Sequence, residues 1–291
     1  ASGEITIFHN SKKIGTRDIP AGYYQLHQNG IYHFNKKNYQ VESIIKTQNG
    51  ANAYLKKSDE IQKRTIPIVK TSLTQVSEKK SIKKEIDSTT TKITLRYGLI
   101  DMNRTITGYL KGNYNDSADK FETINGDSIS TWNNFNWNSK HYCTSIFIPS
   151  EFGTKIKSDV KNSIVTDSKI HTITHVLVNA SKILTKSESN DIDAYYEDGV
   201  IHLFDNTSDG YNGCSKMIYE NFEKIMDTCF DLVNECDCPV DPKQKKAVSE
   251  GEEWGGCPKC TFTTNYCQTK NKKLSKNEAL EFFSIFKREI K

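Results

Sequence analysis

The spacing of five cysteines near the C-terminal end constrains this chain more than any other feature of its sequence. They are Cys236 and Cys238 as a CxC pair, Cys257 and Cys260 as a CPxC pair, and Cys267. A short spacer places two sulfur atoms on one tight turn, and a second pair can complete a tetrahedral shell around zinc. The spacing therefore predicts one structural zinc ion bound by four of the five. The CPxC pair and Cys267 are the expected members, and one residue of the CxC pair completes the set.

Disulfides, buried apolar cysteines and a redox CxxC motif are the alternatives for these residues. The chain is rich in lysine and begins without the basic and apolar regions of a signal peptide, so we expect a cytoplasmic protein with reduced cysteines. The segment 255–260 (GGCPKC) has the composition of a polar turn, and the βαβ context of a redox CxxC is missing. Three further cysteines lie in other segments and are not expected ligands: Cys143, Cys214 and Cys229.

Charge is unevenly distributed along the chain, although the net charge is only +4. Residues 1–100 carry 17 Lys and Arg against 8 Asp and Glu, whereas residues 171–267 carry 8 against 17. A basic surface can follow the phosphate backbone of DNA, although for any single lysine a solvated face is the simpler interpretation. The acidic stretch 188–209 is expected to face away from DNA, towards a protein partner. The expected phosphate contacts are Lys36, Lys37, Lys56, Lys57, Lys63 and Arg64.

Patterns of apolar and turn-forming residues predict an α+β protein. Residues 1–165 form a β-rich module, for which a small barrel is one architecture, and residues 166–291 form an α/β module that carries the cysteines. In the first module, Tyr23–His27 and Ile31–Phe34 flank Asn29-Gly30, which is a hairpin signal. The remaining expectations are strands at 41–45, 53–55, 92–97, 105–110 and 145–149, a loop at 112–140 and a mobile loop near 77–90.

Helical periodicity dominates the second module. Apolar residues spaced by three and four predict amphipathic helices at 170–184 and 214–233, with an acidic hairpin at 192–204 between them. A capping box at Ser275–Glu278 begins a final helix. The cysteine pairs thus lie between two amphipathic helices, where a structural metal can fix the angle between them. The sequence has no run of 18 apolar residues, so we expect no membrane partner.

Two further groups of residues invite a functional interpretation. His171 and His175 lie one turn apart on a predicted helix, a spacing that suits zinc, but packing beside the core is favoured because no third ligand is evident. The chain has no GxxxxGK[ST] loop and no acidic DExx box after an apolar strand, so we do not expect it to hydrolyse ATP. Four aromatic residues form either a stacking platform for single-stranded bases or the core of a small barrel: Tyr23, Tyr24, Tyr32 and Phe34.

The chain resembles the C-terminal region of superfamily 2 DNA helicases of the MrfA/YprA type. The cysteine segment, with its CxC pair, its GCPxC turn and a further cysteine, carries the most specific part of this resemblance. It is weakest over residues 50–165. The segments that carry it are Pro20–Tyr32, His171–Leu177, Leu203–Asp205, Asp209–Ser215, Cys236–Cys238, Gly256–Cys260, Cys267 and Leu274–Ala279.

The resemblance implies a non-catalytic, zinc-binding and DNA-binding accessory unit of a superfamily 2 helicase, acting in phage defence or DNA repair. Its implied cofactor is zinc, and its implied partners are DNA and a helicase subunit. The chain is then either a C-terminal fragment of a single-chain repair helicase or a stand-alone protein like the DrmB subunit of DISARM-type phage defence. Two other classes remain open: a metal-dependent nucleic-acid enzyme using the His171/His175 region, and a scaffold that docks a partner through its acidic half.

Overall fold

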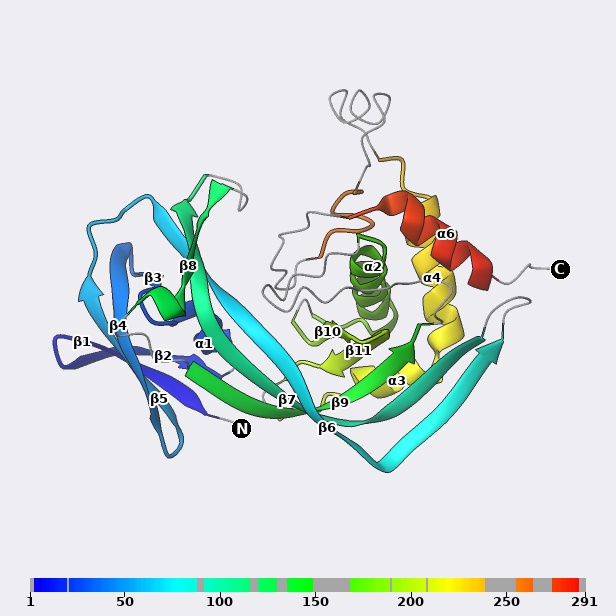
Figure 1. Cartoon of the computed structure of the whole chain (residues 1–291), viewed down its shortest axis with the longest axis horizontal. Coiled ribbons are helices and arrows are strands. Elements are labelled where there is room, and N and C mark those ends of the chain that lie inside the picture. The colour runs from blue at the N-terminus through cyan, green and yellow to red at the C-terminus, as the bar shows by residue number, and fades with distance from the viewer. Residues whose placement is uncertain are drawn as a thin grey trace. The chain divides into compact units, whose positions relative to one another are not determined.

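The structure is a computed structural model of the chain, in which two compact units are distinguished (Figure 1). One unit comprises Ala1–Gln75 and Asp101–Lys140, and the other comprises Val76–Ile100 and His141–Lys291. Side chains are not described for residues 74–92. The residues that the structure describes are 3–19, 21–87, 92–115, 120–129, 135–148, 168–188, 190–207, 209–238, 255–263 and 274–287.

The first unit contains a five-stranded mixed sheet in the order β2-β1-β5-β4-β3. Neighbouring strands are antiparallel except for β1 and β5, which run parallel. Within the described residues β2 and β3 are the two edges, so these strands do not close into a small barrel, the architecture that the sequence left possible. Alternate residues, such as Ile5 and Ile7, are buried against a core that also holds Phe135 and Trp137. The elements are β1 (Glu4–His9), β2 (Lys12–Asp18), α1 (Ala21–Gln25), β3 (Ile31–Phe34), β4 (Lys37–Thr47) and β5 (Gly50–Lys57).

The expected hairpin around Asn29-Gly30 is wrong. Helix α1 occupies most of the predicted first strand, and β3 instead pairs forwards with β4. The turn of that hairpin is Asn35-Lys36, where both residues have positive φ (47° and 60°) and Phe34 faces Lys37. Two residues with positive φ match the right-handed twist of the flanking strands, and asparagine tolerates this conformation well. Asn35 is therefore the residue in the sequence that indicates the position of the hairpin turn.

Three long strands continue the chain, and each contributes residues to both units. They are β6 (Lys63–Asp87), β7 (Lys92–Asn113) and β9 (Phe135–Phe147), accompanied by β8 (Glu122–Asn125) and the 3-10 helix η2 (Gly126–Ser128). They belong to a sheet of order β10-β11-β9-β7-β6, with β8 paired to β7. The units therefore do not follow the expected boundary at residue 165, because segments 76–100 and 141–148 belong with the helices.

Two loops expected from the sequence are strands in the structure. Residues 77–87 extend β6, and the segment 112–140 contains β8 and the start of β9. In that sheet order β6 is an edge strand. Lysine-rich, polar sequences are common on edge strands because they discourage pairing with other chains, so low hydrophobicity does not distinguish such a strand from a loop. Residues 88–90 of the expected loop lie outside the described residues.

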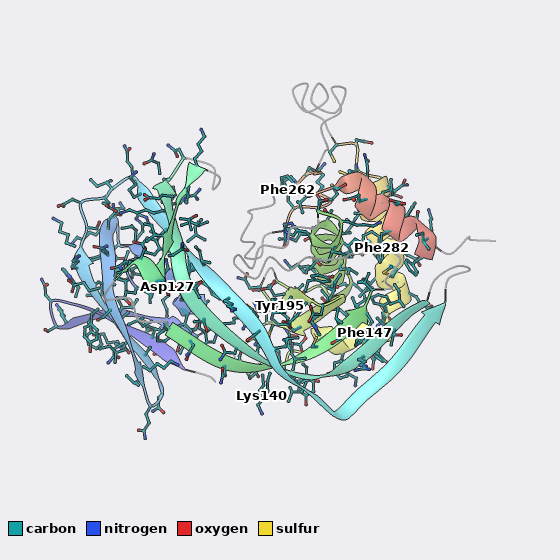
Figure 2. All side chains as sticks on the ribbon, viewed as in Figure 1. Asp127, Lys140, Phe147, Tyr195, Phe262 and Phe282 are labelled. Carbon is teal, nitrogen blue, oxygen red and sulfur yellow. The ribbon has the colours of Figure 1, made fainter. Side chains whose placement is uncertain are left out.

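Among its described residues, the second unit packs four helices with the hairpin β10–β11. Helix α2 contacts α3, α4 and α6, and its apolar face joins one buried core with theirs. Phe282, labelled in Figure 2, comes from α6 and is 1% exposed within that core. The elements are α2 (Ser168–Thr185), β10 (Ile192–Glu197), β11 (Val200–Asp205), α3 (Cys214–Glu220), α4 (Phe222–Asn234) and α6 (Lys276–Phe286). In this part of the chain, as in the rest that is described, no helix has the length and apolar character needed to cross a membrane.

The helices and the hairpin of the second unit confirm the α+β prediction, with one difference. The helix expected at 214–233 is interrupted at Asn221, whose φ of −116° and ψ of 27° leave the helical region. The predicted cap of the final helix is present, because Ser275 Oγ accepts a hydrogen bond from the Glu278 amide at 3.3 Å. Glu278 does not complete the box, since its carboxylate instead accepts from Ser168 Oγ of α2 at 2.8 Å.

Candidate metal centre

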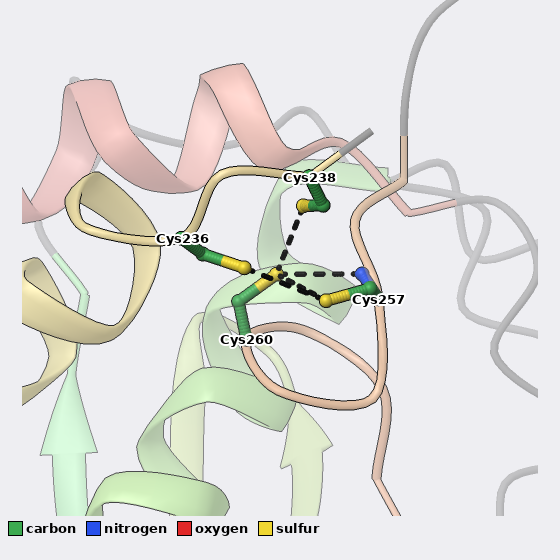
Figure 3. A group of neighbouring side chains, drawn as sticks. All are labelled: Cys236, Cys238, Cys257 and Cys260. Atoms are coloured by element: carbon green, nitrogen blue, oxygen red, sulfur yellow. Dashed lines mark hydrogen bonds between the residues drawn. The ribbon is translucent and has the colours of Figure 1, made fainter. Parts of the chain in front are cut away.

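Four cysteine sulfur atoms converge at the end of helix α4, as Figure 3 shows. Cys236 directly follows the C-cap of α4, and its Sγ lies 3.5 Å from that of Cys257. Cys260 Sγ lies 3.7 Å from Cys238 Sγ and 3.8 Å from Cys257 Sγ. All four sulfur atoms lie within 4.8 Å of one another. Sulfur atoms at the corners of a tetrahedron, about 2.3 Å from a central zinc, are roughly 3.8 Å apart, so the four donors fit a zinc ion.

The backbone of the CPxC turn presents its two sulfur atoms on the same side. The amides of Cys260, Thr261 and Phe262 all donate to the Cys257 carbonyl at 3.1 Å. The Cys257 amide points inwards and donates to Cys260 Sγ at 3.3 Å. Gly256 has a φ of 103°, and a Cβ there would overlap the Thr261 hydroxyl. The glycine before the CPxC pair is therefore required by the turn itself.

Burial makes the thiols of Cys236 and Cys260 difficult to ionise unless a cation is bound beside them. Burial, with a smaller contribution from the neighbouring sulfur atoms, raises the pKa of the Cys260 thiol to about 12, and burial also raises the pKa of Cys236. Without a metal, the thiols of Cys236 and Cys260 hold their protons at neutral pH. A bound zinc ion supplies the positive charge that stabilises thiolates, and binding releases the protons.

Both members of the CxC pair belong to this group of four, so the choice between Cys236 and Cys238 does not arise in the geometry. Cys267, which was expected to be a ligand, lies outside the described residues. The three cysteines that were not expected to bind metal are buried elsewhere. Cys229 is completely buried in the helical core, where its thiol lies 3.8 Å from the Val176 carbonyl. It packs as a small apolar side chain.

Helix α2 holds the CPxC turn through three successive carbonyl groups. His175 Nδ1 donates to the Thr261 carbonyl at 3.1 Å, and the Asn179 amide donates to the carbonyls of Cys260 (3.2 Å) and Phe262 (2.9 Å). His175 is 6% exposed, and its ring lies 4.4 Å from that of His171, which is 7% exposed. His175 therefore positions the turn that carries two sulfur atoms, a supporting role that is common around metal ligands.

Helix α6 holds the other pair of cysteines. Lys276 Nζ donates to the Cys236 carbonyl at 2.6 Å, and it lies 3.4 Å from both the Cys238 carbonyl and Cys238 Sγ. Sequence reasoning missed this lysine and Asn179, although signals for both exist. Asn179 follows His175 by one helical turn, which places it on the same face. Lys276 occupies the first turn of a helix, where a cation is unfavourable unless it has a partner.

The predicted DNA contacts divide into two groups. Lys36 and Lys37 lie at the β3–β4 turn, while Lys56 and Lys57 end β5, and all four are exposed. Strand pairing brings the Lys36/Lys37 pair close to the Lys56/Lys57 pair, because Tyr39 faces Lys57 and the Ser58 amide donates to the Asn38 carbonyl at 2.9 Å. We call these four lysines the basic end of the sheet.

The other two predicted contacts, Lys63 and Arg64, are half-buried. The Arg64 guanidinium stacks over the rings of Tyr114 and Phe121, at 5.6 and 5.0 Å from their centroids. The predicted aromatic platform belongs mainly to the core. Tyr23 and Tyr32 are each 4% exposed, and Tyr24 and Phe34 pack against the same core.

Comparison with known proteins identifies the class of this zinc-binding unit. Residues 173–261 match the family model described as the MrfA Zn-binding domain. An uncharacterized protein of Methanocaldococcus jannaschii is 27% identical over 121 residues, which cover 38% of this chain and 93% of that protein. The crystal structure of the DUF1998 helicase MrfA bound to DNA superimposes with a TM-score of 0.56 at 18% identity, covering 99% of this chain and 34% of that one.

The chain thus carries a helicase-associated zinc-binding unit. More particularly, residues 173–261 match the MrfA Zn-binding domain, in agreement with the predicted resemblance, and the four clustered cysteines are positioned to hold its zinc ion. The chain shares the fold of the corresponding part of MrfA and spans about a third of that helicase chain. The zinc-binding match covers all four clustered cysteines and ends at Thr261, directly after Cys260.

Proposed function

We propose that this chain is a non-catalytic accessory unit of an MrfA-type helicase, in which zinc is structural and the β-rich unit contacts DNA. The observation that carries the proposal is the match of residues 173–261 to the MrfA Zn-binding domain, together with the four converging cysteines. The ligands would be Cys236, Cys238, Cys257 and Cys260. Four sulfur donors fill a tetrahedral shell and leave no position for substrate, whereas a catalytic zinc keeps one position open.

The DNA-binding part of the proposal rests on fold and charge. The MrfA structure with the same fold was solved bound to DNA. The basic end of the sheet offers four exposed lysines on neighbouring chain segments, at the β3–β4 turn and at the end of β5. Glu60, which follows these lysines along the chain, has its carboxylate paired with Lys111 at 2.8 Å. Its carboxylate is therefore engaged by Lys111, and the exposed ammonium groups of the four lysines can meet an anionic partner such as the phosphate backbone.

ATP hydrolysis and strand separation would come from a helicase core supplied by a partner or by another segment of a longer chain. Phage defence and DNA repair are the two processes in which such a unit would act. The geometry gives no support to an enzyme that uses His171 and His175, because both rings are buried and His175 donates to a backbone carbonyl. A scaffold that never touches DNA remains the contrasting outcome of the test.

The test is the salt dependence of DNA binding, measured by fluorescence anisotropy on single- and double-stranded oligonucleotides. The double variant Lys36→Glu/Lys37→Glu should weaken binding to all sequences alike, because phosphate contacts position a protein without specifying bases. Each lost contact should flatten the slope of log affinity against log salt by roughly 0.7 to 0.9.

A matched control makes the same charge change in the other unit. Lys216 and Lys224 are exposed on α3 and α4, and Lys216→Glu/Lys224→Glu should leave the slope unchanged. Equal loss of affinity in both double variants would indicate a general charge effect and contradict the proposed surface. Absence of binding by the parent protein at low salt would favour the scaffold instead.

A further inference from the structure

Lys276 stands out because of where it lies on its helix. It is the first residue of α6, directly after the Ser275 cap, and the N-terminal end of a helix carries partial positive charge. A lysine side chain at this position normally extends into solvent. Here the side chain is only half-exposed, and its ammonium group turns towards the cysteine cluster.

The backbone around Lys276 is fixed from two sides. The Ser275 amide donates to Thr172 Oγ1 of α2 at 2.7 Å, and Ser275 Oγ caps the helix. Ser168 Oγ donates to the Glu278 carboxylate, which joins the first turns of α2 and α6 a second time. The backbone of Lys276 is therefore anchored independently of the contacts that its side chain makes.

The ammonium group meets three acceptors on one short segment. Two are the carbonyls of Cys236 and Cys238, and the third is the sulfur of Cys238. The carbonyl contacts set the curvature of the CxC segment and hence the direction in which its sulfur atoms point. The contact with sulfur brings a positive charge beside a site that carries a net negative charge when zinc is bound, since four thiolates exceed the charge of Zn²⁺ by two.

We infer that Lys276 is a positioning residue of the zinc centre: its ammonium group orients the CxC pair, offsets thiolate charge at Cys238 and couples helix α6 to the metal. This role does not depend on DNA binding. It would also explain why a lysine occupies an unfavourable helix position, because the thiolate and the two carbonyls replace the missing acidic partner. Loss of residues that support metal ligands typically weakens metal affinity by roughly 10- to 100-fold.

The test uses the full chain and three variants. Lys276→Met keeps the length of the side chain and removes its charge, Lys276→Arg keeps the charge, and Lys287→Met removes a lysine just beyond the other end of α6. The ammonium group of Lys287 lies over the Phe230 ring, 4.0 Å from its centroid, and so contacts an aromatic ring where Lys276 contacts the cysteines. Zinc affinity is measured by competition with a chromogenic chelator. We expect a loss of roughly 10- to 100-fold for Lys276→Met and values near the parent for the other two.

A spectroscopic readout separates the charge of Lys276 from simple packing. With cobalt(II) in place of zinc, the sulfur-to-metal charge-transfer absorption should move to longer wavelength in Lys276→Met, because the thiolate loses the nearby positive charge. An unchanged spectrum, or a zinc affinity within about twofold of the parent, would overturn the inference. If Lys276→Met does not fold, Lys276→Arg decides: near-parental zinc binding supports the role of the charge, and its loss contradicts it.

Discussion

The zinc centre and the basic end of the sheet are built on opposite principles. The zinc centre joins residues far apart in sequence, and each sulfur-bearing segment is held by hydrogen bonds from a different helix, α2 or α6. The basic end joins two strand ends that are neighbours in one sheet, and its lysines are exposed. Metal coordination requires sulfur atoms at fixed positions, whereas phosphate contacts require only that charge be near the backbone. The zinc centre is therefore preorganised, whereas the lysine side chains of the basic end can adapt their positions.

This contrast predicts that damage to the zinc centre should be severe and local. Replacing Cys260, which is completely buried, by serine should abolish zinc binding and unfold the segment that it holds, because structural zinc sites contribute on the order of 10 kcal/mol. Elemental analysis measures the zinc, and far-ultraviolet circular dichroism measures the loss of helix. Stoichiometric zinc in Cys260→Ser would refute the assignment.

The same variant also tests whether the two surfaces are independent. The basic end belongs to the other compact unit, so the DNA affinity proposed for it, measured at low salt, should change by no more than about twofold in Cys260→Ser. A much larger loss would show that the zinc centre also supports DNA binding, and the comparison drawn above would fail.

Acid should weaken both units through one buried histidine in each. Burial lowers the pKa of His27 and of His202 to about 4, from an ordinary value of 6.5. The unfolded chain gains a proton near pH 6.5 while the folded protein stays neutral, so the stability from each histidine is complete above pH 6.5 and is lost as the pH falls towards about 4. Between about pH 7 and about pH 5 each should cost roughly 2 kcal/mol.

Urea unfolding at these two pH values measures the effect. The variants His27→Gln and His202→Gln should each lose less stability on acidification than the parent, because glutamine does not titrate in this range. His202 accepts or donates a hydrogen bond with Ser145 Oγ at 2.9 Å, so its replacement also lowers stability at neutral pH. The comparison therefore uses the change between pH values. An identical change in parent and variants would exclude these histidines as the cause.

The smallest effect on zinc should come from the three cysteines outside the centre. Cys143 and Cys229 are almost completely buried, and Cys214 is buried at the start of α3. Changing all three to alanine should cost about 1 kcal/mol each in stability and leave one zinc ion per chain, as elemental analysis would show. Loss of metal from a folded triple variant would mean that the ligand set has been drawn wrongly.

Agreement between sequence and structure is best where the interactions are local. The CPxC turn follows from a four-residue spacing and a glycine, and the cap of α6 follows from Ser275 and Glu278. The Asn29-Gly30 prediction failed although it too was local. The hairpin turn forms at Asn35-Lys36 instead, because β3 pairs with β4, the strand that follows it. Short signals of equal strength are decided by which strand pairing buries the apolar side chains.

By itself, the sequence determined the chemistry of the metal, the helices of the second unit and the resemblance to MrfA-type helicases, because each depends on residue types at short spacing. Only the tertiary structure decided that residues 77–87 are a strand, that both members of the CxC pair approach the CPxC pair, and which side chains support them. His175 reaches the Thr261 carbonyl across 86 residues, and Lys276 reaches the Cys236 carbonyl across 40. Such contacts form only when packed helices bring distant segments together, since no local pattern encodes the partner of a single side chain.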